Sequence, residues 1–335
     1  MPVHNAGAYL KPAVDSILCQ RDVKFELLII DDHSDDDAIE ALEDNPLITV
    51  LTSSKRGIVS ALNIGINEAK YPFIARMDAD DISEPTRLSN QLEYLIKNPS
   101  IDICGCKVKI FNELNDIGDG YRYYENWINN LCDSTGIERD FFIESPIPHP
   151  TAMLRKELLV LLGGYHDSTW PEDYDLWFRL LLSGAKFGKP AGEAIYKWRD
   201  HKQRLSRTDP RYSKQMFLQC KAHYLSNYLQ RRGISKCMIL GSGPTGLKMH
   251  DYLCEKNIQV EAFVDIDPKL IGRSRRAKII YVTTENITSY KIKKFITADD
   301  SIFISAVSTR GGREKIRFYL QNLGLSETND YIIAA

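Results

Sequence analysis

The sequence lacks the features that mark membrane, exported and nucleic-acid-binding proteins. Its 335 residues contain no apolar run near the about 20 residues that cross a bilayer. No basic segment followed by an apolar one opens the chain, so we expect no signal peptide. The seven cysteines form no Cys-x-x-Cys pair, which favours reduced thiols over disulfides or zinc. With a net charge of −2, the chain has no basic field. We therefore expect a cytoplasmic protein with no nucleic-acid partner.

What the sequence does contain is an alternation of strand-like and helix-like segments over its first 115 residues. Short apolar runs at 25–30 and 47–51 alternate with segments of helical period, such as 58–69. Strands that are apolar on both faces predict an α/β fold with a mainly parallel sheet covered by helices. One strand is expected over 101–108. Residues 112–147 are polar and irregular, and we interpret them as a variable insertion.

The length of the chain predicts about two domains. The first pattern ends near residue 205, residues 206–233 predict a helical linker, and a second βα pattern fills residues 234–335. We expect this last part to be a smaller Rossmann-like α/β domain.

A glycine-rich turn stands at the start of this second pattern. Gly241, Gly243 and Gly246 lie between a strand and a helix, and Asp265 follows about 20 positions later, as in dinucleotide-binding turns. The same glycines would also serve a tight turn and helix packing alone. A dinucleotide, a mononucleotide, a sugar derivative or no ligand all stay open.

Two acidic clusters follow predicted strands of the first domain. Asp32 ends one strand, and Asp78, Asp80 and Asp81 follow another. Ligands of parallel sheets bind at the carboxyl ends of strands. Crowded carboxylates repel one another unless a divalent cation lies among them, although a solvated acidic turn would look the same in sequence.

Several separated motifs of residues 1–205 resemble family 2 glycosyltransferases of the GT-A fold. The motifs are Met1-Pro-Val-His-Asn-Ala, Ile29-Ile-Asp-Asp-His-Ser-Asp-Asp, Lys55-Arg-Gly, Met77-Asp-Ala-Asp-Asp, His149-Pro and Glu172-Asp-Tyr-Asp-Leu-Trp. The resemblance implies a bacterial-type enzyme that uses Mn2+ or Mg2+ and a nucleotide-diphosphate sugar, with UDP favoured, and inverts the anomeric carbon. It also implies a glycan or lipid-linked acceptor in surface polysaccharide synthesis, which leaves peripheral association with the inner face of the membrane open.

The resemblance also assigns roles to single residues. For the donor it implies Pro2, Asn5, Asp32, Lys55, Arg56, Gly57 and Asp78. For the metal it implies Asp80, Asp81 and His201, and for the catalytic base Asp173. For the acceptor or a phosphate it suggests His149, Glu172 and Trp170, and for sugar stacking Trp170 and Trp177.

Each role has a plainer alternative. Ser34 and Asp37 fit a capping box, so the segment around Asp32 would then only cap a helix that follows Asp36. Glu172 and Asp173 are also favourable charges at a helix N-terminus. A single histidine more often packs than ligates.

The chain departs from the family in two ways. The family places several apolar residues before the Met-Pro motif, so we expect that the first strand is truncated and that the natural start lies upstream of Met1. The Gln-x-x-Arg-Trp element of processive synthases is absent, which predicts single additions.

The segment that begins Phe263-Val-Asp resembles the N-terminal module of bacterial sugar acyltransferases. Because of the glycine-rich turn at 241–246, an NAD-linked oxidoreductase and a non-catalytic nucleotide-sugar-binding protein stay as alternative functions.

Overall fold

The computed structural model describes residues 1–114, 116–270, 272–282, 301–309 and 311–335. These form two compact units. The first unit contains residues 1–138 and 146–209, and the second contains residues 139–145 and 210–335. The expected division into residues 1–205, a linker and residues 234–335 stays a prediction, since compactness alone does not define a folding domain.

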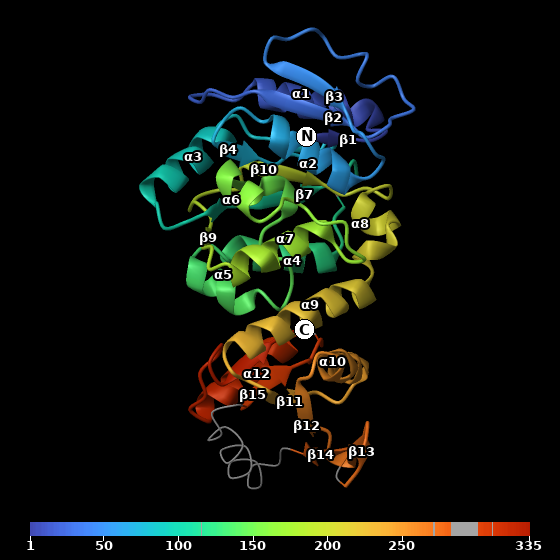
Figure 1. Ribbon diagram of the computed structural model, residues 1–335, viewed down its shortest axis with the longest axis vertical. Helices are drawn as coiled ribbons and strands as arrows, with labels where there is room; N and C mark the ends of the chain where they lie inside the picture. Colours follow the sequence, from blue (N-terminus) through green and yellow to red (C-terminus); the bar gives the residue numbers. More distant parts are fainter. Residues whose placement is uncertain (115, 271, 283–300, 310) are drawn as a thin grey trace. The chain divides into compact units, whose positions relative to one another are not determined.

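Short strands of the first unit form three small sheets (Figure 1). The strands are β1 (Pro2–Val3), β2 (Leu27–Asp31), β3 (Ile48–Thr52), β4 (Phe73–Ala75), β5 (Ile82–Ser83), β6 (Ile103–Cys104), β7 (Val108–Phe111), β8 (Met153–Arg155), β9 (Phe187–Gly188) and β10 (Tyr196–Arg199). The orders are β1-β2-β3, β4-β8-β6-β9 and β5-β10-β7. The first sheet is parallel, whereas β8 and β5 run antiparallel to their neighbours.

The α-helices of the first unit bury apolar side chains in its core. They are α1 (Leu10–Leu18), α2 (Ile58–Glu68), α3 (Arg87–Lys97), α4 (Asp119–Asn130), α5 (Ser134–Asp140, shared between the units), α6 (Lys156–Leu161), α7 (Glu172–Leu182) and α8 (Leu205–Thr208). The apolar side chains of α1 recur at helical spacing, and Leu10, Val14 and Ile17 are buried. In β2, Leu27, Ile29 and Ile30 are buried, as expected for a strand covered on both faces.

The interpretation of residues 112–147 as irregular is wrong, because α4 and α5 lie there. Hydrogen bonds join α4 to β7: Glu125 accepts from the Ile110 amide at 2.6 Å, and Asn129 bonds both the amide and the carbonyl of Val108. Besides these polar side chains, α4 packs Tyr121, Tyr124, Trp127 and one aliphatic residue, Ile128, against the core. An aliphatic helical period is absent, so the pattern gave no helix signal.

Two further expectations for the first unit are wrong. The strand expected over 101–108 is divided into β6 and β7, which belong to different sheets. Gly105 lies at the division, where an added Cβ would come within 2.9 Å of Ile147. No helix follows Asp36, and residues 36–42 form turns and bends instead.

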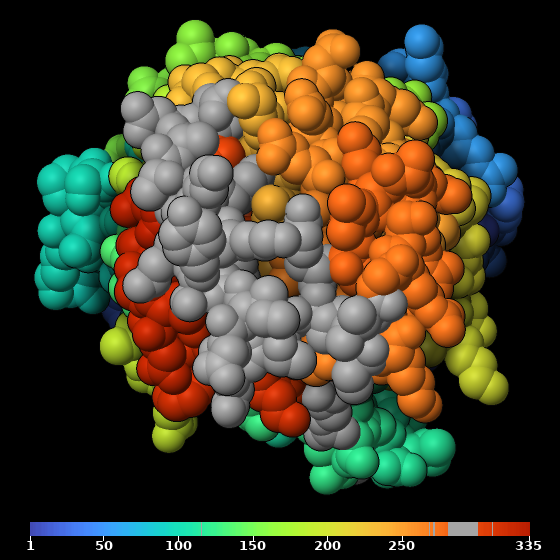
Figure 2. All heavy atoms as spheres, turned by 90° about the horizontal axis from the view of Figure 1, so that it is seen from below, coloured from blue at the N-terminus to red at the C-terminus, as the bar shows by residue number. Residues whose placement is uncertain are grey.

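The second unit has one larger sheet. Its strands are β11 (Lys236–Leu240), β12 (Gln259–Asp265), β13 (Ser274–Arg275), β14 (Lys278–Val282), β15 (Ser301–Ser305) and β16 (Tyr331–Ile333), in the order β13-β14-β12-β11-β15-β16. All neighbours pair in parallel except β13 and β14. In its described residues the α-helices are α9 (Lys214–Arg231), α10 (Pro244–Glu255) and α12 (Gly312–Asn322). Figure 2 shows one face of this unit, with the segment of β12 to β14 in orange and the segment from β15 onward in red.

None of the helices in the described ranges is long and apolar enough to span a membrane.

A buried arginine connects several elements of the first unit. The Arg87 side chain is 0% exposed and donates to the carbonyls of Arg76 and Pro150 at 2.6 and 3.0 Å. It also donates to Gln91, and its guanidinium lies 4.8 Å from the centre of the Tyr196 ring. Because Arg76 lies two residues before Asp78, its hydrogen bond with Arg87 fixes the start of the acidic loop.

We expect Arg87→Met to lower the free energy of unfolding of the first unit by about 3 kcal/mol, because two buried carbonyls lose their donor. The chain's four tryptophans all lie in this unit, so tryptophan fluorescence during urea unfolding follows it. Lys97→Met at the exposed end of the same helix should change stability by less than about 0.5 kcal/mol. Equal stability of the two variants would contradict the role of Arg87.

Candidate active site

Asp32 is fixed at the carboxyl ends of β1 and β2. Its amide donates to the Val3 carbonyl at 2.7 Å, which continues the parallel ladder one residue past the strand. Its buried carboxylate accepts from the Gly57 amide at 2.7 Å. Gly57 adopts a φ of +125°, a conformation that other residues rarely adopt. The predicted donor residues Asp32 and Gly57 are therefore in direct contact.

Apart from Asp78, the other predicted donor residues lie in β1 or in the loops that follow β1 and β3. His4 contacts the Asp32 carbonyl at 2.9 Å, and Arg56 donates to the other His4 ring nitrogen at 3.0 Å. Asn5 has a φ of +51°, and its side chain accepts from the Asp35 amide at 2.6 Å. Pro2 lies in β1 and Lys55 in the loop that precedes α2.

Ser34 does not cap a helix here. Its hydroxyl accepts from the Asn5 amide at 3.2 Å, so the loops after β1 and β2 are joined to each other. The capping alternative for this segment is wrong, because no helix follows it.

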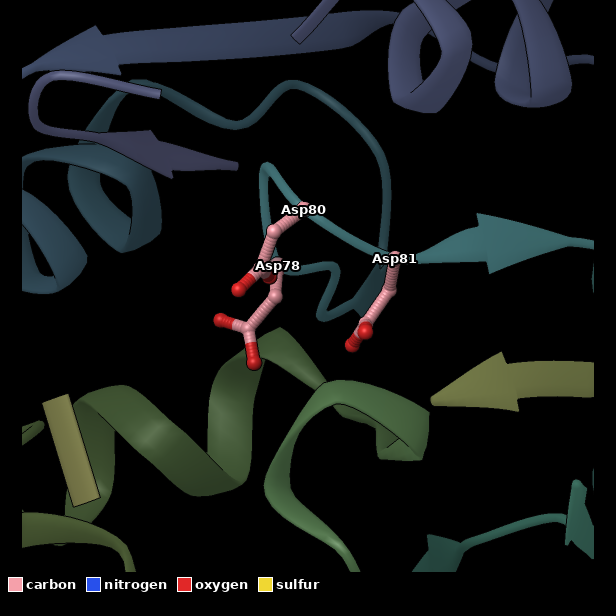
Figure 3. A group of neighbouring side chains, drawn as sticks. All are labelled: Asp78, Asp80 and Asp81. Atoms are coloured by element: carbon pink, nitrogen blue, oxygen red, sulfur yellow. The ribbon is translucent and has the colours of Figure 1, made fainter. Parts of the chain in front are cut away.

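The carboxylates of Asp78, Asp80 and Asp81 gather in the loop between β4 and β5 (Figure 3). Each offers an oxygen, and these oxygens lie within 4.8 Å of one another. Figure 3 shows the side chains of Asp78 and Asp80 close together, with Asp81 nearer to the following strand.

β10 brings His201 to this loop. The strand pairs antiparallel with β5, with Lys197 opposite Ile82, so the residues that follow β10 run back beside the acidic loop. His201 Nε2 lies 2.7 Å from an Asp80 oxygen, and the Arg199 side chain donates to the Asp80 carbonyl at 2.6 Å. The structure thus brings His201 to Asp80, although 121 residues separate them. A metal site formed by Asp80, Asp81 and His201 stays a prediction.

Asp81 has the most perturbed environment of the three carboxylates. It is completely buried and accepts from the Tyr196 hydroxyl at 2.8 Å and from the Arg199 amide at 2.7 Å. Burial, and then the charge of Asp80, raise the pKa of Asp81 to about 7, against the smaller opposing effect of these hydrogen bonds. A cation among these carboxylates would relieve the same repulsion, and hard oxygen donors with one imidazole suit Mn2+ or Mg2+.

Arg76 was not predicted, although it is next to Met77 at the end of β4. Its guanidinium pairs with the Asp78 carboxylate and is buried. Its Nε has no hydrogen-bond partner in the described part of the chain. A basic residue two positions before Asp78 was the available signal, and it was not distinctive among 43 lysines and arginines.

A buried network of polar side chains lies next to the predicted base, Asp173. Asp173 lies half-buried in the first turn of α7, where its carboxylate accepts from the Tyr174 amide at 2.7 Å. Glu172 is buried, with an oxygen 3.9 Å from His149 Nδ1. The other His149 nitrogen lies 2.7 Å from the Tyr165 hydroxyl. His149 is therefore part of a buried network, and its contact with an acceptor or phosphate stays a prediction.

Charges reach across this network. Burial, and then the positive charge of Arg76, lower the pKa of His149 well below its usual value, so the ring is neutral. Burial raises the pKa of Tyr165, and the negative charges of Glu172 and Asp173 add to that rise. The positive charge of Arg76 lowers the pKa of both His149 and Tyr165. Arg76 also pairs with Asp78, so it lies between the acidic loop and this buried network.

The two tryptophans near the base differ in exposure. Trp177 is 0% exposed and donates to the Ile147 carbonyl at 3.2 Å, so its predicted stacking on a sugar is wrong. Trp170 is partly exposed, and its ring nitrogen donates to Asp175 at 2.9 Å. The helical position of Trp177, on the inner face of α7, explains the difference.

Residues 1–162 match the family model described as "Glycosyl transferase family 2". This range, just under half of the 335 residues, is thus similar to family 2 glycosyltransferases. The sequence resembles the bifunctional glycosyltransferase pgtA of Dictyostelium discoideum, with 29% identity over 69% of this chain and 34% of pgtA. It resembles the O-antigen biosynthesis glycosyltransferase WbnJ of Escherichia coli, with 28% identity over 70% of this chain and 89% of WbnJ. The chain thus spans about a third of pgtA and most of WbnJ.

The fold is similar to that of TarS from S. aureus. The crystal structure of TarS 1-349 in complex with UDP-GlcNAc aligns with a TM-score of 0.54 and 15% identity, over 76% of this chain and 69% of that one. The predicted fold class, a mixed α/β structure of the GT-A type, is confirmed.

The glycine-rich turn lies outside the range of the family 2 model. Gly241 has a φ of +95°, and a Cβ on Gly246 would lie 2.0 Å from the Gly241 carbonyl oxygen. Asp265 accepts from the amide and hydroxyl of Ser242, at 2.8 and 2.6 Å. Gly241 and Gly246 thus serve the turn and the packing of α10. Nucleotide binding by the turn of Gly241, Gly243 and Gly246 with Asp265, the Rossmann-like interpretation and the NAD-linked alternative stay predictions.

We expect His149 to lower the stability of the first unit as the pH drops below about 6.5, against the opposite contribution of Asp81. The pKa of His149 is lowered in the folded protein, so the unfolded chain binds more protons in this range. The loss from this residue is at most about 1.4 kcal/mol per pH unit. Urea unfolding between pH 5 and 8 measures it.

His149→Gln, which retains a polar group for Tyr165, should flatten this dependence. Exposed His33→Asn is the matched control and should leave the slope unchanged. An unchanged slope in His149→Gln would contradict the buried neutral state of His149.

Proposed function

We propose that the protein transfers a sugar from a nucleotide-diphosphate donor to a hydroxyl of a glycan or lipid-linked acceptor, with inversion, in surface polysaccharide synthesis. One observation carries this proposal. Asp32, directly after β2, is held by the Gly57 amide, and the carboxylates of Asp78, Asp80 and Asp81 gather with His201 beside Asp80. This arrangement supports a nucleotide contact at Asp32 and a cation site at the acidic loop.

Related proteins support this class of reaction. WbnJ is named for O-antigen biosynthesis, and AmsE of Erwinia amylovora, 28% identical over 42% of this chain, is named for amylovoran biosynthesis. TarS, which shares the fold, has been crystallised with UDP and with UDP-GlcNAc. We therefore favour a UDP-sugar as the donor.

Each donor residue has a physical task in this proposal. The Asp32 carboxylate, oriented by Gly57, accepts a hydrogen bond from an N–H of the base. Asn5 and Pro2 shape the adjoining loop, and the cationic side chains of Lys55 and Arg56 are available to a phosphate. Asp78, oriented by its ion pair with Arg76, contacts the ribose.

Asp80, Asp81 and His201 would hold the divalent cation. When bound, the cation would stabilise the charge that develops on the leaving diphosphate. The chain's own contribution is orientation: Arg199 donates to the Asp80 carbonyl and the Asp81 carboxylate, and Tyr196 donates to Asp81. These hydrogen bonds hold the acidic loop in one geometry before any ligand binds.

Asp173 would act as the general base. Its carboxylate takes the proton of the acceptor hydroxyl while that oxygen attacks the anomeric carbon opposite the diphosphate, which gives inversion. The Tyr174 amide holds one carboxylate oxygen at 2.7 Å and so orients the group. The neighbouring pair of Glu172 and His149 supports the start of α7 from the buried side.

We expect Asp80→Asn to weaken Mn2+ binding by about 100-fold or more, because a charged ligand is lost from a crowded site. Isothermal titration with MnCl2, with and without UDP, measures the change. Exposed Asp15→Asn on α1 is the control and should bind Mn2+ as the parent does. If Asp80→Asn bound Mn2+ and UDP with the affinity of the parent, the metal role would be lost.

We expect Asp173→Asn to lower kcat by about 10²- to 10⁴-fold, with little change in UDP-sugar affinity, because only the proton acceptor is removed. UDP release from a panel of UDP-sugars with a glycan acceptor measures turnover, and calorimetry measures donor binding. Asp167→Asn, an exposed neighbour in the same segment, should retain activity. Undiminished turnover in Asp173→Asn would rule out Asp173 as the base.

A further inference from the structure

The segment between α6 and α7 leads directly to the predicted base. It contains residues 162–171, and Asp173 follows in the first turn of α7. Gly163 and Gly164 open the segment with φ angles of +76° and +68°, which other residues rarely adopt. A Cβ on Gly164 would collide with the side-chain oxygen of Asn63. The chain therefore changes direction at two adjoining glycines and packs closely against α2.

Asn63 of α2 fixes the backbone just after these glycines. Its side-chain nitrogen donates to the Tyr165 carbonyl at 2.9 Å, and its side-chain oxygen accepts from the Tyr165 amide at 2.8 Å. One side chain thus satisfies both backbone groups of Tyr165. The start of the segment is attached to α2 by two hydrogen bonds, although 102 residues separate Asn63 from Tyr165.

Arg179 attaches the same start to α7. Its two terminal nitrogens donate to the carbonyls of Leu162 and Gly164 at 2.9 and 2.7 Å. Its Nε donates to the Asp175 carboxylate at 2.8 Å, one turn earlier in α7. Because the guanidinium is planar and its donors have fixed directions, these bonds set the position of both carbonyls relative to the helix.

Asp175 extends this attachment to the end of the segment. The residue is 2% exposed, and its second oxygen accepts from the Trp170 ring nitrogen at 2.9 Å. Hydrogen bonds to a carboxylate are stronger than those between neutral groups. The Trp170 ring is partly exposed. The ring therefore has a fixed orientation relative to the helix that carries Asp173.

The pair of Asp175 and Arg179 acts on geometry more than on stability. A buried ion pair adds little net stability, because the desolvation of both charges offsets their attraction. Two aliphatic side chains would fill the same space, but they would hold neither the two carbonyls nor the indole nitrogen. Between its two attachments the segment is exposed, at His166, Asp167 and Thr169. The pair thus orders a surface beside the predicted base.

We propose that Asp175 and Arg179 are positioning residues for the acceptor. They hold residues 162–170 as one wall of the acceptor site and present the Trp170 ring to the sugar that carries the attacking hydroxyl. The apolar C–H face of a sugar ring packs on an aromatic ring, so the acceptor class is a glycan whose terminal sugar contacts Trp170. This assignment rests on the proposed function and gives a role to two residues that had none.

The test breaks the attachment at either end. Asp175→Asn keeps the size of the side chain and removes its charge, so the ion pair with Arg179 is lost. Trp170→Phe keeps an aromatic ring and removes the N–H donor. It leaves the ion pair intact and therefore decides the proposal even if Asp175→Asn unfolds. Glu93→Gln is the matched control, because it breaks an exposed ion pair of the same i, i+4 spacing on α3.

Two parameters separate a positioning role from a general defect. UDP release from a panel of UDP-sugars, with methyl β-glycosides of glucose, galactose and N-acetylglucosamine as acceptors, gives the acceptor KM. Calorimetry with UDP and MnCl2 gives the affinity on the donor side. We expect Asp175→Asn to raise the acceptor KM by about 10-fold or more, because the acceptor wall is no longer ordered before binding. The Kd of UDP should change by less than about 2-fold.

The double variant tests whether the two residues act as a unit. Trp170→Phe alone should raise the acceptor KM by about 3-fold or more, and its addition to Asp175→Asn should raise the KM little further, because both changes break the same contact. Amide exchange at residues 162–170 should be faster in Asp175→Asn than in the parent, with α2 unchanged. Glu93→Gln should match the parent in every readout.

An unchanged acceptor KM in Asp175→Asn would overturn the assignment. An equal loss of acceptor and UDP affinity would also overturn it, since that outcome marks a general defect of the fold. Effects of the two substitutions that multiply would show that the residues act independently, which the assignment excludes. A parent chain that releases UDP from no UDP-sugar would refute the proposed function itself, whereas an active parent with unaltered variants would refute the positioning role alone.

Discussion

Mutual repulsion among the carboxylates of Asp78, Asp80 and Asp81 is the constraint around which the first unit is organised. Their oxygens lie within 4.8 Å of one another, and one of the three side chains is fully buried. Such a cluster is stable only where fixed donors surround it. Tyr196 and Arg199 supply these donors from β10, and the pairing of β10 with β5 sets their positions.

Buried cations extend this organisation to the rest of the unit. Arg76 pairs with Asp78, and Arg87 holds the Arg76 carbonyl together with the carbonyl of Pro150 next to His149. Through these contacts, the segment that carries the acidic loop and the segment that carries His149 share the same buried donor. A rigid polar framework of this kind would keep donor and base residues in fixed positions during transfer.

The second unit is organised by its sheet, which is continuous and parallel from β14 to β16. In its first turn, Gly241 has a positive φ and Gly246 has no room for a Cβ, so the turn itself requires these glycines. The Asp265 carboxylate accepts hydrogen bonds from Ser242 and from the amides of Ile266 and Asp267. The same residues that suggest a nucleotide in the sequence thus also stabilise the turn itself, which is why the motif alone does not establish a ligand.

The sequence by itself determined the fold class, the order of most elements and the acidic loop, because apolar periodicity and motif spacing are local properties of the chain. The sequence did not predict the helices within 112–147. The α4 helix contacts the sheet through Glu125 and Asn129, and their hydrogen bonds form only when β7 is in place. Only the tertiary structure buried Trp177 and brought His201 to Asp80. It alone also placed Arg76 beside Asp78 in a buried pair and joined Trp170 and Arg179 through Asp175. Those outcomes depend on strand pairing and helix packing between distant segments, which no local pattern encodes.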